Sequence, residues 1–142
     1  MAMSIGNIAN ALRRLGTCIM GVGLIALGIC CVIDPIAASK LYGLPIGSSG
    51  NSDWVLVAGL RDFGLGVSTL ALHVAHPAAI RVLAPSLLLI PLGDAGLTFQ
   101  LGGTAMDAGA HIFGSFAIAI LTVCAWLDPA LDGYTGCSSK EK

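Results

Sequence analysis

Residues 16–33 read GTCIMGVGLIALGICCVI, eighteen residues without a charged side chain. An α-helix needs about 20 predominantly apolar residues to cross the hydrocarbon core of a bilayer. The run follows a polar segment that contains two arginines, and it ends at an Asp-Pro pair. These residues therefore predict a transmembrane helix over 16–33.

Three further apolar segments follow, at residues 54–74, 79–100 and 108–127. Of the 142 residues, 56% are hydrophobic and 11% are charged, whereas a soluble domain carries about 25% charged residues. We expect an all-α fold, an integral membrane bundle of four helices. It would form a single membrane domain over residues 1–142, with a polar tail at 130–142.

Proline and glycine indicate how these segments are connected and packed. The connection between residues 34 and 53 contains two prolines and the sequence GSSGNS, which favour turns over a regular element. Pro85 and Pro91 lie inside the third segment and predict kinks. The 19 glycines, many of them in the apolar segments, predict close helix packing and permit a homodimer.

The distribution of basic residues predicts the orientation. With four spans, both termini and the connection after the second span lie on one side of the membrane. That side carries five basic residues, against Lys40 alone on the other side: Arg13, Arg14, Arg81, Lys140 and Lys142. The positive-inside rule therefore predicts a multi-pass protein with both termini in the cytosol, in the endoplasmic reticulum of a eukaryotic cell. A net charge of -1 without a dense basic cluster argues against nucleic-acid binding.

Two charged residues in different segments fall at the same depth. Arg61 lies seven residues after Trp54, and Asp94 lies six residues before Gln100. Because these two helices run in opposite directions, both side chains lie about 10 Å below the same membrane surface at 1.5 Å per residue. Asp62 and His111 fall in the same layer, so four ionisable residues from three helices meet there.

A charge at mid-membrane costs roughly 2.5 to 3.5 kcal/mol, so these side chains must face inward and pair. One interpretation is structural: a buried pair between Arg61 and Asp94 that fixes the register of the helices. Two carboxylates, a guanidinium and an imidazole exceed what one register-setting pair needs. The composition of this layer therefore favours a functional site.

No metal site is predicted. His73 and His76 are three residues apart, but they provide only two ligands, and catalytic metals usually take three protein ligands. Serine-hydrolase, zinc-protease, phosphate-loop and dinucleotide motifs do not occur in the sequence. We therefore expect a protein without a cofactor.

The stretches GLRDFGLG (59–66), LIPLGDAGL (89–97) and AGAHIFGS (108–115), with GLP at 43–45, resemble a family of small four-helix membrane proteins of unknown function found in fungi and bacteria. The family's arginine-aspartate, glycine-aspartate and histidine positions match the four ionisable residues of this layer. Some fungal members resemble the small hydrolases or cyclases that accompany polyketide pathways and open epoxides. The resemblance thus implies a membrane-embedded epoxide hydrolase or cyclase in a secondary-metabolite pathway.

An analogy from chemistry points the same way. The soluble limonene-epoxide hydrolase class uses an Asp-Arg-Asp set, in which one carboxylate activates water and an acidic partner protonates the epoxide oxygen. This chain supplies the same groups, and two carboxylates can divide the two roles. We expect Asp62 and Asp94 to act as base and acid in either order and Arg61 to orient them. Three further residues are expected to bind an apolar polyketide or terpenoid epoxide: Tyr42, Trp54 and His111.

Two other function classes stay open. The chain could be a non-enzymatic lipid or metabolite binder or a transporter, with membrane lipid as a partner beside the small molecule. It could also be a structural membrane subunit. An enzyme and a binder both predict a pocket beside Arg61, whereas a structural subunit predicts none there.

Overall fold

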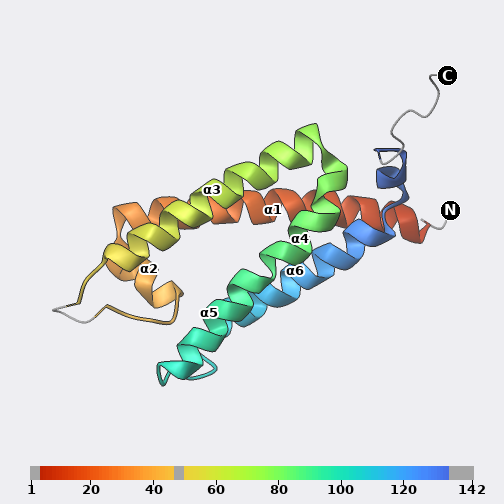
Figure 1. The fold of residues 1–142 in the computed structure, drawn as a ribbon. Coiled ribbons are helices and arrows are strands. Elements are labelled where there is room, and N and C mark those ends of the chain that lie inside the picture. The colour runs from red at the N-terminus through yellow and green to blue at the C-terminus, as the bar shows by residue number, and fades with distance from the viewer. Residues whose placement is uncertain (1–3, 47–49, 135–142) are drawn as a thin grey trace.

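The computed structural model of the chain describes residues 4–46 and 50–134, and every regular element in these ranges is a helix. In chain order the elements are α1 (Ile5–Ile33), α2 (Pro35–Leu41), α3 (Asp53–Ala75), η1 (Pro77–Ala79), α4 (Ile80–Leu87), α5 (Leu89–Gln100), α6 (Gly109–Leu127) and η2 (Pro129–Tyr134) (Figure 1). Four segments are long and apolar enough to cross a membrane: Ile5–Ile33, Asp53–Ala75, Pro77–Gln100 and Gly109–Leu127. The predicted all-α class with four membrane-spanning helices is confirmed.

Helix α1 begins at Ile5, eleven residues before the predicted limit at residue 16. The hydroxyl of Ser4 accepts a hydrogen bond from the Asn7 N–H and caps the first turn. Residues 5–15 are mostly good helix formers without proline, so the helix continues upstream of the apolar run. Its 29 residues span about 43 Å, more than the hydrocarbon thickness of about 30 Å.

The expectation that residues 34–53 lack a regular element is wrong for its first part, where α2 forms. Asp34 ends α1 and also caps α2, because its Oδ1 accepts the Ala37 N–H at 2.9 Å. Pro35 then occupies the first turn of a helix, a position that proline tolerates well. After α2, Gly43 has a φ of 69°, and a Cβ there would collide with the Asp107 carbonyl. The end of α2 is therefore docked against the turn that precedes α6.

The third span is interrupted at Leu88, between α4 and α5. Pro91 has no N–H to donate to the Leu87 carbonyl one turn earlier, which accounts for a break at this point. Pro85 lies inside α4 without ending it.

The last described element is η2, so the first residues of the expected polar tail at 130–142 form a short helix. Residues 135–142, including the two lysines counted for orientation, lie outside the described residues. A Cβ at Gly6 would lie 2.9 Å from Pro129, so the start of α1 and η2 meet at one end of the bundle (Figure 1).

Helices α1 and α3 pack through glycines, as the glycine content predicts. A Cβ at Gly28 would lie 2.6 Å from the Gly59 carbonyl oxygen, and one at Gly66 would lie 2.6 Å from the Gly21 carbonyl oxygen. Both pairs repeat after seven residues, about two helical turns. The two backbones therefore run antiparallel and in close contact.

The bundle consists of two halves. One is the α1–α3 pair with α2, and the other is formed by α4, α5 and α6 (Figure 1). An apolar cluster of four buried residues holds α4 against α6: Ile80, Ala84, Leu121 and Ala125. Helix α6 also packs against α1, whereas α3 and α5 have few residues in contact. The two halves diverge away from the end at which α1 starts and α6 finishes (Figure 1).

Candidate functional site

Tyr42 ends α2 and points into the bundle, where its hydroxyl lies 2.5 Å from Asp62 Oδ2 on α3. The Tyr42 residue is 5% exposed and Asp62 is 3% exposed. The Cys31 thiol of α1 lies 3.8 Å from the same hydroxyl. Trp54 packs its ring against the Tyr42 ring edge to face, with 5.9 Å between centroids. A phenol, a carboxylate and a thiol from three elements thus share one buried pocket of the fold.

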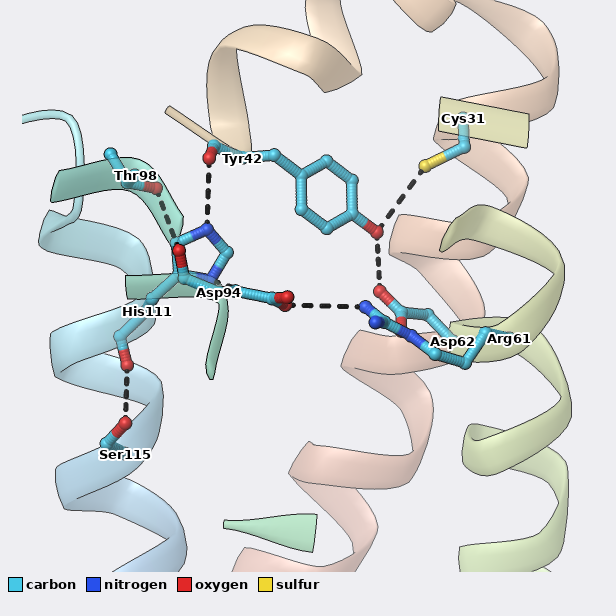
Figure 2. Close-up of polar contacts among 8 residues, drawn as sticks. All are labelled: Cys31, Tyr42, Arg61, Asp62, Asp94, Thr98, His111 and Ser115. Atoms are coloured by element: carbon cyan, nitrogen blue, oxygen red, sulfur yellow. Dashed lines mark hydrogen bonds and ion pairs between the residues drawn. The ribbon is translucent and has the colours of Figure 1, made fainter. Parts of the chain in front are cut away.

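Arg61 lies between two carboxylates (Figure 2). Its Nε donates to Asp62 Oδ1 at 2.9 Å, and its Nη2 lies 3.4 Å from Asp94 Oδ2 on α5. The side chain of Arg61 is 37% exposed and that of Asp94 is 23% exposed. The guanidinium therefore connects α3 to α5, two helices that otherwise have few residues in contact.

His111 completes the layer from α6 (Figure 2). Its Nε2 lies 3.0 Å from the Tyr42 carbonyl oxygen, and its Nδ1 lies 3.9 Å from Asp94 Oδ2. A carbonyl only accepts hydrogen bonds, so Nε2 carries a proton. In the neutral imidazole Nδ1 is then the unprotonated nitrogen, and it faces Asp94.

The structure brings together five of the six predicted site residues, namely Arg61, Asp62, Asp94, His111 and Tyr42, and Trp54 flanks them. Cys31, Thr98 and Ser115 were missed in the sequence. Thr98 donates to the Asp94 carbonyl and Ser115 to the His111 carbonyl, both at 2.9 Å. Each follows its partner by four residues, and this spacing of hydroxyl residues was the signal that could have identified them.

Burial and the hydrogen bond to Asp62 raise the pKa of the Tyr42 phenol well above its ordinary value of about 10. The charged phenolate is disfavoured both because water is excluded and because a carboxylate lies beside it. Tyr42 therefore stays a neutral hydrogen-bond donor throughout the physiological pH range.

A cavity of about 590 Å³ lies next to Trp54, and none of Tyr42, Arg61, Asp62, Asp94 and His111 lines it. It is lined by residues 43–45 and 101–103 with Trp54 and Asp107. Trp54 both lines the cavity and packs against the Tyr42 ring. Two hydrogen bonds from Thr104 lower the pKa of the Asp107 carboxyl at its rim. A second cavity of about 260 Å³ is apolar and lies between α5 and α6, where Ser115 forms part of its wall.

A second ionic group lies at the opposite end of the bundle. Arg13 of α1 and Asp128 after α6 form a buried pair, with 2.6 Å between Nε and Oδ2. Arg81 of α4 donates to the carbonyls of Ala125 and Asp128, and it also pairs with Asp132. From the sequence, Arg13 and Arg81 were interpreted only as cytosolic charges. Their partners lie more than 40 residues away in the chain, and nothing near either arginine indicates them.

No group of three or more His, Cys, Asp or Glu side chains within residues 4–46 and 50–134 is placed to hold a metal ion. The polar layer offers hydrogen-bond donors and acceptors: a guanidinium, a phenol, an imidazole and two carboxylates.

Residues 21–127 match the model of the family described as "Domain of unknown function (DUF4267)". The matched range contains all six predicted site residues. No curated protein and no solved structure matches the chain.

Proposed function

The chain belongs to the DUF4267 family, and we propose that it is a membrane-embedded epoxide hydrolase or epoxide-opening cyclase without a cofactor. One observation carries this proposal: a single guanidinium contacts two carboxylates, Asp62 and Asp94, with a phenol on one and an imidazole beside the other. This is the Asp-Arg-Asp composition with which the soluble limonene-epoxide hydrolase class opens epoxides.

Epoxide opening needs a nucleophile and a proton donor. In hydrolysis, the oxygen of water bonds to an oxirane carbon while the carbon–oxygen bond of the ring breaks. A base takes one proton from the water and an acid gives one proton to the ring oxygen, so the product is a diol. In cyclisation, a hydroxyl of the substrate replaces the water and the product is a cyclic ether with a new hydroxyl group.

The exposure of the two carboxylates supports a division of roles. Asp94 is the more exposed, so we assign it the contact with water or the substrate hydroxyl, as general base. Asp62 is buried behind Arg61 and Tyr42, and we assign the proton donation to the Asp62 carboxyl, which the Tyr42 hydroxyl holds through a 2.5 Å hydrogen bond. Arg61 orients both carboxylates, and His111 Nδ1 lies 3.9 Å from Asp94.

An apolar polyketide or terpenoid epoxide is the proposed substrate class. The outer surfaces of the spans are apolar, so such a molecule would concentrate in the bilayer around them. The 590 Å³ cavity beside Trp54 has the size of a small-molecule site, because ligand pockets usually measure about 300 to 1,000 Å³. We propose that it receives the polar end of the substrate. A fungal-type secondary-metabolite pathway is the proposed context.

Isosteric variants test the catalytic roles. Asp94→Asn and Asp62→Asn each keep the side-chain shape and should lower turnover of an epoxide at least about 100-fold, the usual contribution of one positioned acid or base. Asp53→Asn is the matched control, since Asp53 lies at the exposed start of the same helix as Asp62 and contacts Asn51. Full activity of both Asn variants, or no turnover of any epoxide by the purified wild type, would refute the proposal.

Oxygen-18 water distinguishes the two reactions. Label in the product identifies hydrolysis, whereas an unlabelled cyclic ether identifies capture by a hydroxyl of the substrate. Either result supports epoxide opening at this site.

A structural role is the second candidate, and a specific observation favours it. Arg61 joins α3 to α5, which have few other contacts. If this is its whole purpose, Asp94→Asn should lower the melting temperature. The loss should be smaller than the about 3 to 5 kcal/mol that breaking a buried pair costs, because both side chains are partly exposed. A catalytic Asp94→Asn variant would instead fold normally and lose turnover. A lipid or metabolite binder would keep a bound molecule but show no turnover in any variant.

We also propose that both termini face the cytosol, in the endoplasmic reticulum of a eukaryotic cell. The basic residues at the end where α1 begins support this orientation. A reporter fused to the C-terminus should remain unglycosylated and cytosolic. A glycosylated reporter would reverse the assignment. A second copy of the chain stays the proposed protein partner.

A further inference from the structure

The apolar cavity of about 260 Å³ between α5 and α6 has a buried floor and an open mouth. Ala95 of α5 and Ser115 of α6 line it and are each 8% exposed, so they form the floor. Leu92 and Phe116 line it while being 51% and 67% exposed, so the mouth lies on the outer surface of the bundle. Both helices belong to segments that are long and apolar enough to cross a membrane. In a bilayer, the mouth therefore faces the hydrocarbon chains of the lipids.

The wall of this cavity suits a hydrocarbon. Of the seven described residues that line it, Ser115 alone is polar. The Ser115 hydroxyl already donates to the His111 carbonyl at 2.9 Å. A polar occupant would lose its hydrogen bonds to water without replacing them here, whereas an aliphatic group loses nothing.

The size of the cavity suits part of a molecule. Ligand pockets usually measure about 300 to 1,000 Å³, and this cavity is smaller. Its lining runs from Leu88 to Ala95 on one side and from Ile112 to Ala119 on the other, seven residue steps each. At 1.5 Å per residue this is a length of about 10 Å. One flexible aliphatic chain fits such a narrow space better than a fused ring system does.

One end of the cavity adjoins the candidate site. Two of the lining residues directly follow site residues in the chain, Ala95 after Asp94 and Ile112 after His111. Figure 2 shows Ser115 one helical turn along α6 from His111, with the hydrogen bond between them. The imidazole of His111 lies in turn 3.9 Å from the Asp94 carboxylate. A chain that fills the cavity thus ends close to the proposed general base.

We propose that this cavity binds the aliphatic chain of the substrate, and that the epoxide at the end of that chain thereby lies beside Asp94. This inference rests on the proposed function and narrows its substrate class to open-chain epoxides, such as a linear polyketide or an acyclic terpenoid. The chain enters sideways from the bilayer, through the mouth at Leu92 and Phe116. A compact fused-ring epoxide has no chain to place there.

Chain-length selectivity tests this site, with terminal epoxyalkanes of increasing length compared at equal mole fraction in the same bilayer. Ala119 lies eight residues after His111, about 12 Å along α6, at the far end of the cavity. Ala119→Leu fills that end, so turnover of long epoxyalkanes should fall roughly tenfold through overpacking, while turnover of short ones stays unchanged.

Ala117→Leu is the matched control. It makes the same change on the same helix, at an exposed residue outside the cavity, and should keep the chain-length profile of the wild type. The same profile in both variants would overturn the proposal.

Photolabelling provides a readout that does not need turnover. An epoxyalkane with a diazirine at the end of its chain should label α5 and α6 of the wild type and of Ala117→Leu, and an excess of plain epoxyalkane should compete. Ala119→Leu should take up roughly tenfold less label. Saturable labelling without turnover would refute the enzyme and keep the chain site. Turnover with labelling that does not saturate would refute the chain site alone, because ordinary bilayer lipid would then be the occupant.

Discussion

Tyr42 contacts three other residues of the candidate site. Its hydroxyl donates a hydrogen bond to Asp62 of α3, and its carbonyl oxygen accepts one from His111 of α6. Its ring packs against Trp54. The first of these contacts depends on the hydroxyl alone, whereas the other two depend on the backbone and the ring. Removing only the hydroxyl therefore removes the bond to the carboxylate, together with the 3.8 Å contact from the Cys31 thiol.

Tyr42→Phe should lower the free energy of unfolding by about 1 to 3 kcal/mol, because Asp62 Oδ2 loses its buried donor. Under the proposed mechanism it also lowers epoxide turnover. Unfolding in detergent measures the first effect. A double-mutant cycle with Asp62→Asn is the check: if the hydroxyl and the carboxylate interact directly, the two changes are not additive. Additive effects would contradict the contact.

The raised pKa of Tyr42 predicts how stability depends on pH. The folded protein holds the phenol neutral, so this contribution is fully present below the unfolded pKa of about 10 and is lost as the pH rises above it. Between pH 9 and 11, the wild type should lose stability more steeply than Tyr42→Phe. Melting temperatures of both proteins over this range measure the difference, and parallel curves would mean that Tyr42 titrates normally.

At the level of elements, the α1–α3 contact is set by backbone against backbone. A Cβ at Gly66 would meet the Gly21 carbonyl oxygen and the Ile25 nitrogen, neither of which can move as a side chain does. Gly64 lies two residues earlier on the same helix, and a Cβ there would meet nothing within 4 Å. The two glycines thus differ in packing while sharing a helix.

Gly66→Ala should separate α1 from α3 and lower the melting temperature by several degrees, whereas Gly64→Ala should leave it unchanged or raise it. Alanine favours the helix by about 1 kcal/mol over glycine, so only a steric clash can reverse the sign. A thermal-shift comparison of the two variants decides the point. Equal responses would mean that the helices do not meet at Gly66.

The elements also indicate what the sequence could and could not predict. The four spans follow from apolar length alone, and the common depth of Arg61 and Asp94 follows from helix rise. Helix α2 did not follow, because Asp34-Pro35 marks both the end of one helix and the start of the next. The Tyr42–Asp62 bond could not be predicted either, since it depends on how the end of α2 docks against the turn before α6 through Gly43. Contacts that depend on tertiary docking have no periodic signature in the chain.

The whole molecule is held together differently at its two ends. At the end where α1 begins, the halves share apolar packing and the buried Arg13–Asp128 pair. At the other end, the candidate site itself provides much of the connection between α3 and α5. Residues of the Arg13–Asp128 pair are therefore expected to affect stability, whereas residues of the candidate site are expected to affect both stability and function.

Arg13→Gln should cost about 3 to 5 kcal/mol, because it leaves the fully buried Asp128 carboxylate without its partner. Arg14→Gln changes the neighbouring, exposed residue and should stay within about 0.5 kcal/mol. Chemical unfolding of both variants in the same detergent measures the contrast. Similar losses would indicate that net charge at this end matters, rather than the pair.

The Arg13–Asp128 pair joins residues 115 positions apart, the first helix to the end of the last. A ribosome adds about 5 to 20 residues per second, so Asp128 is made on the order of 10 s after Arg13. During that interval the guanidinium has no partner from the other half, and it can remain at the membrane surface while the first hairpin inserts. The pair can therefore form only after synthesis has passed the fourth span.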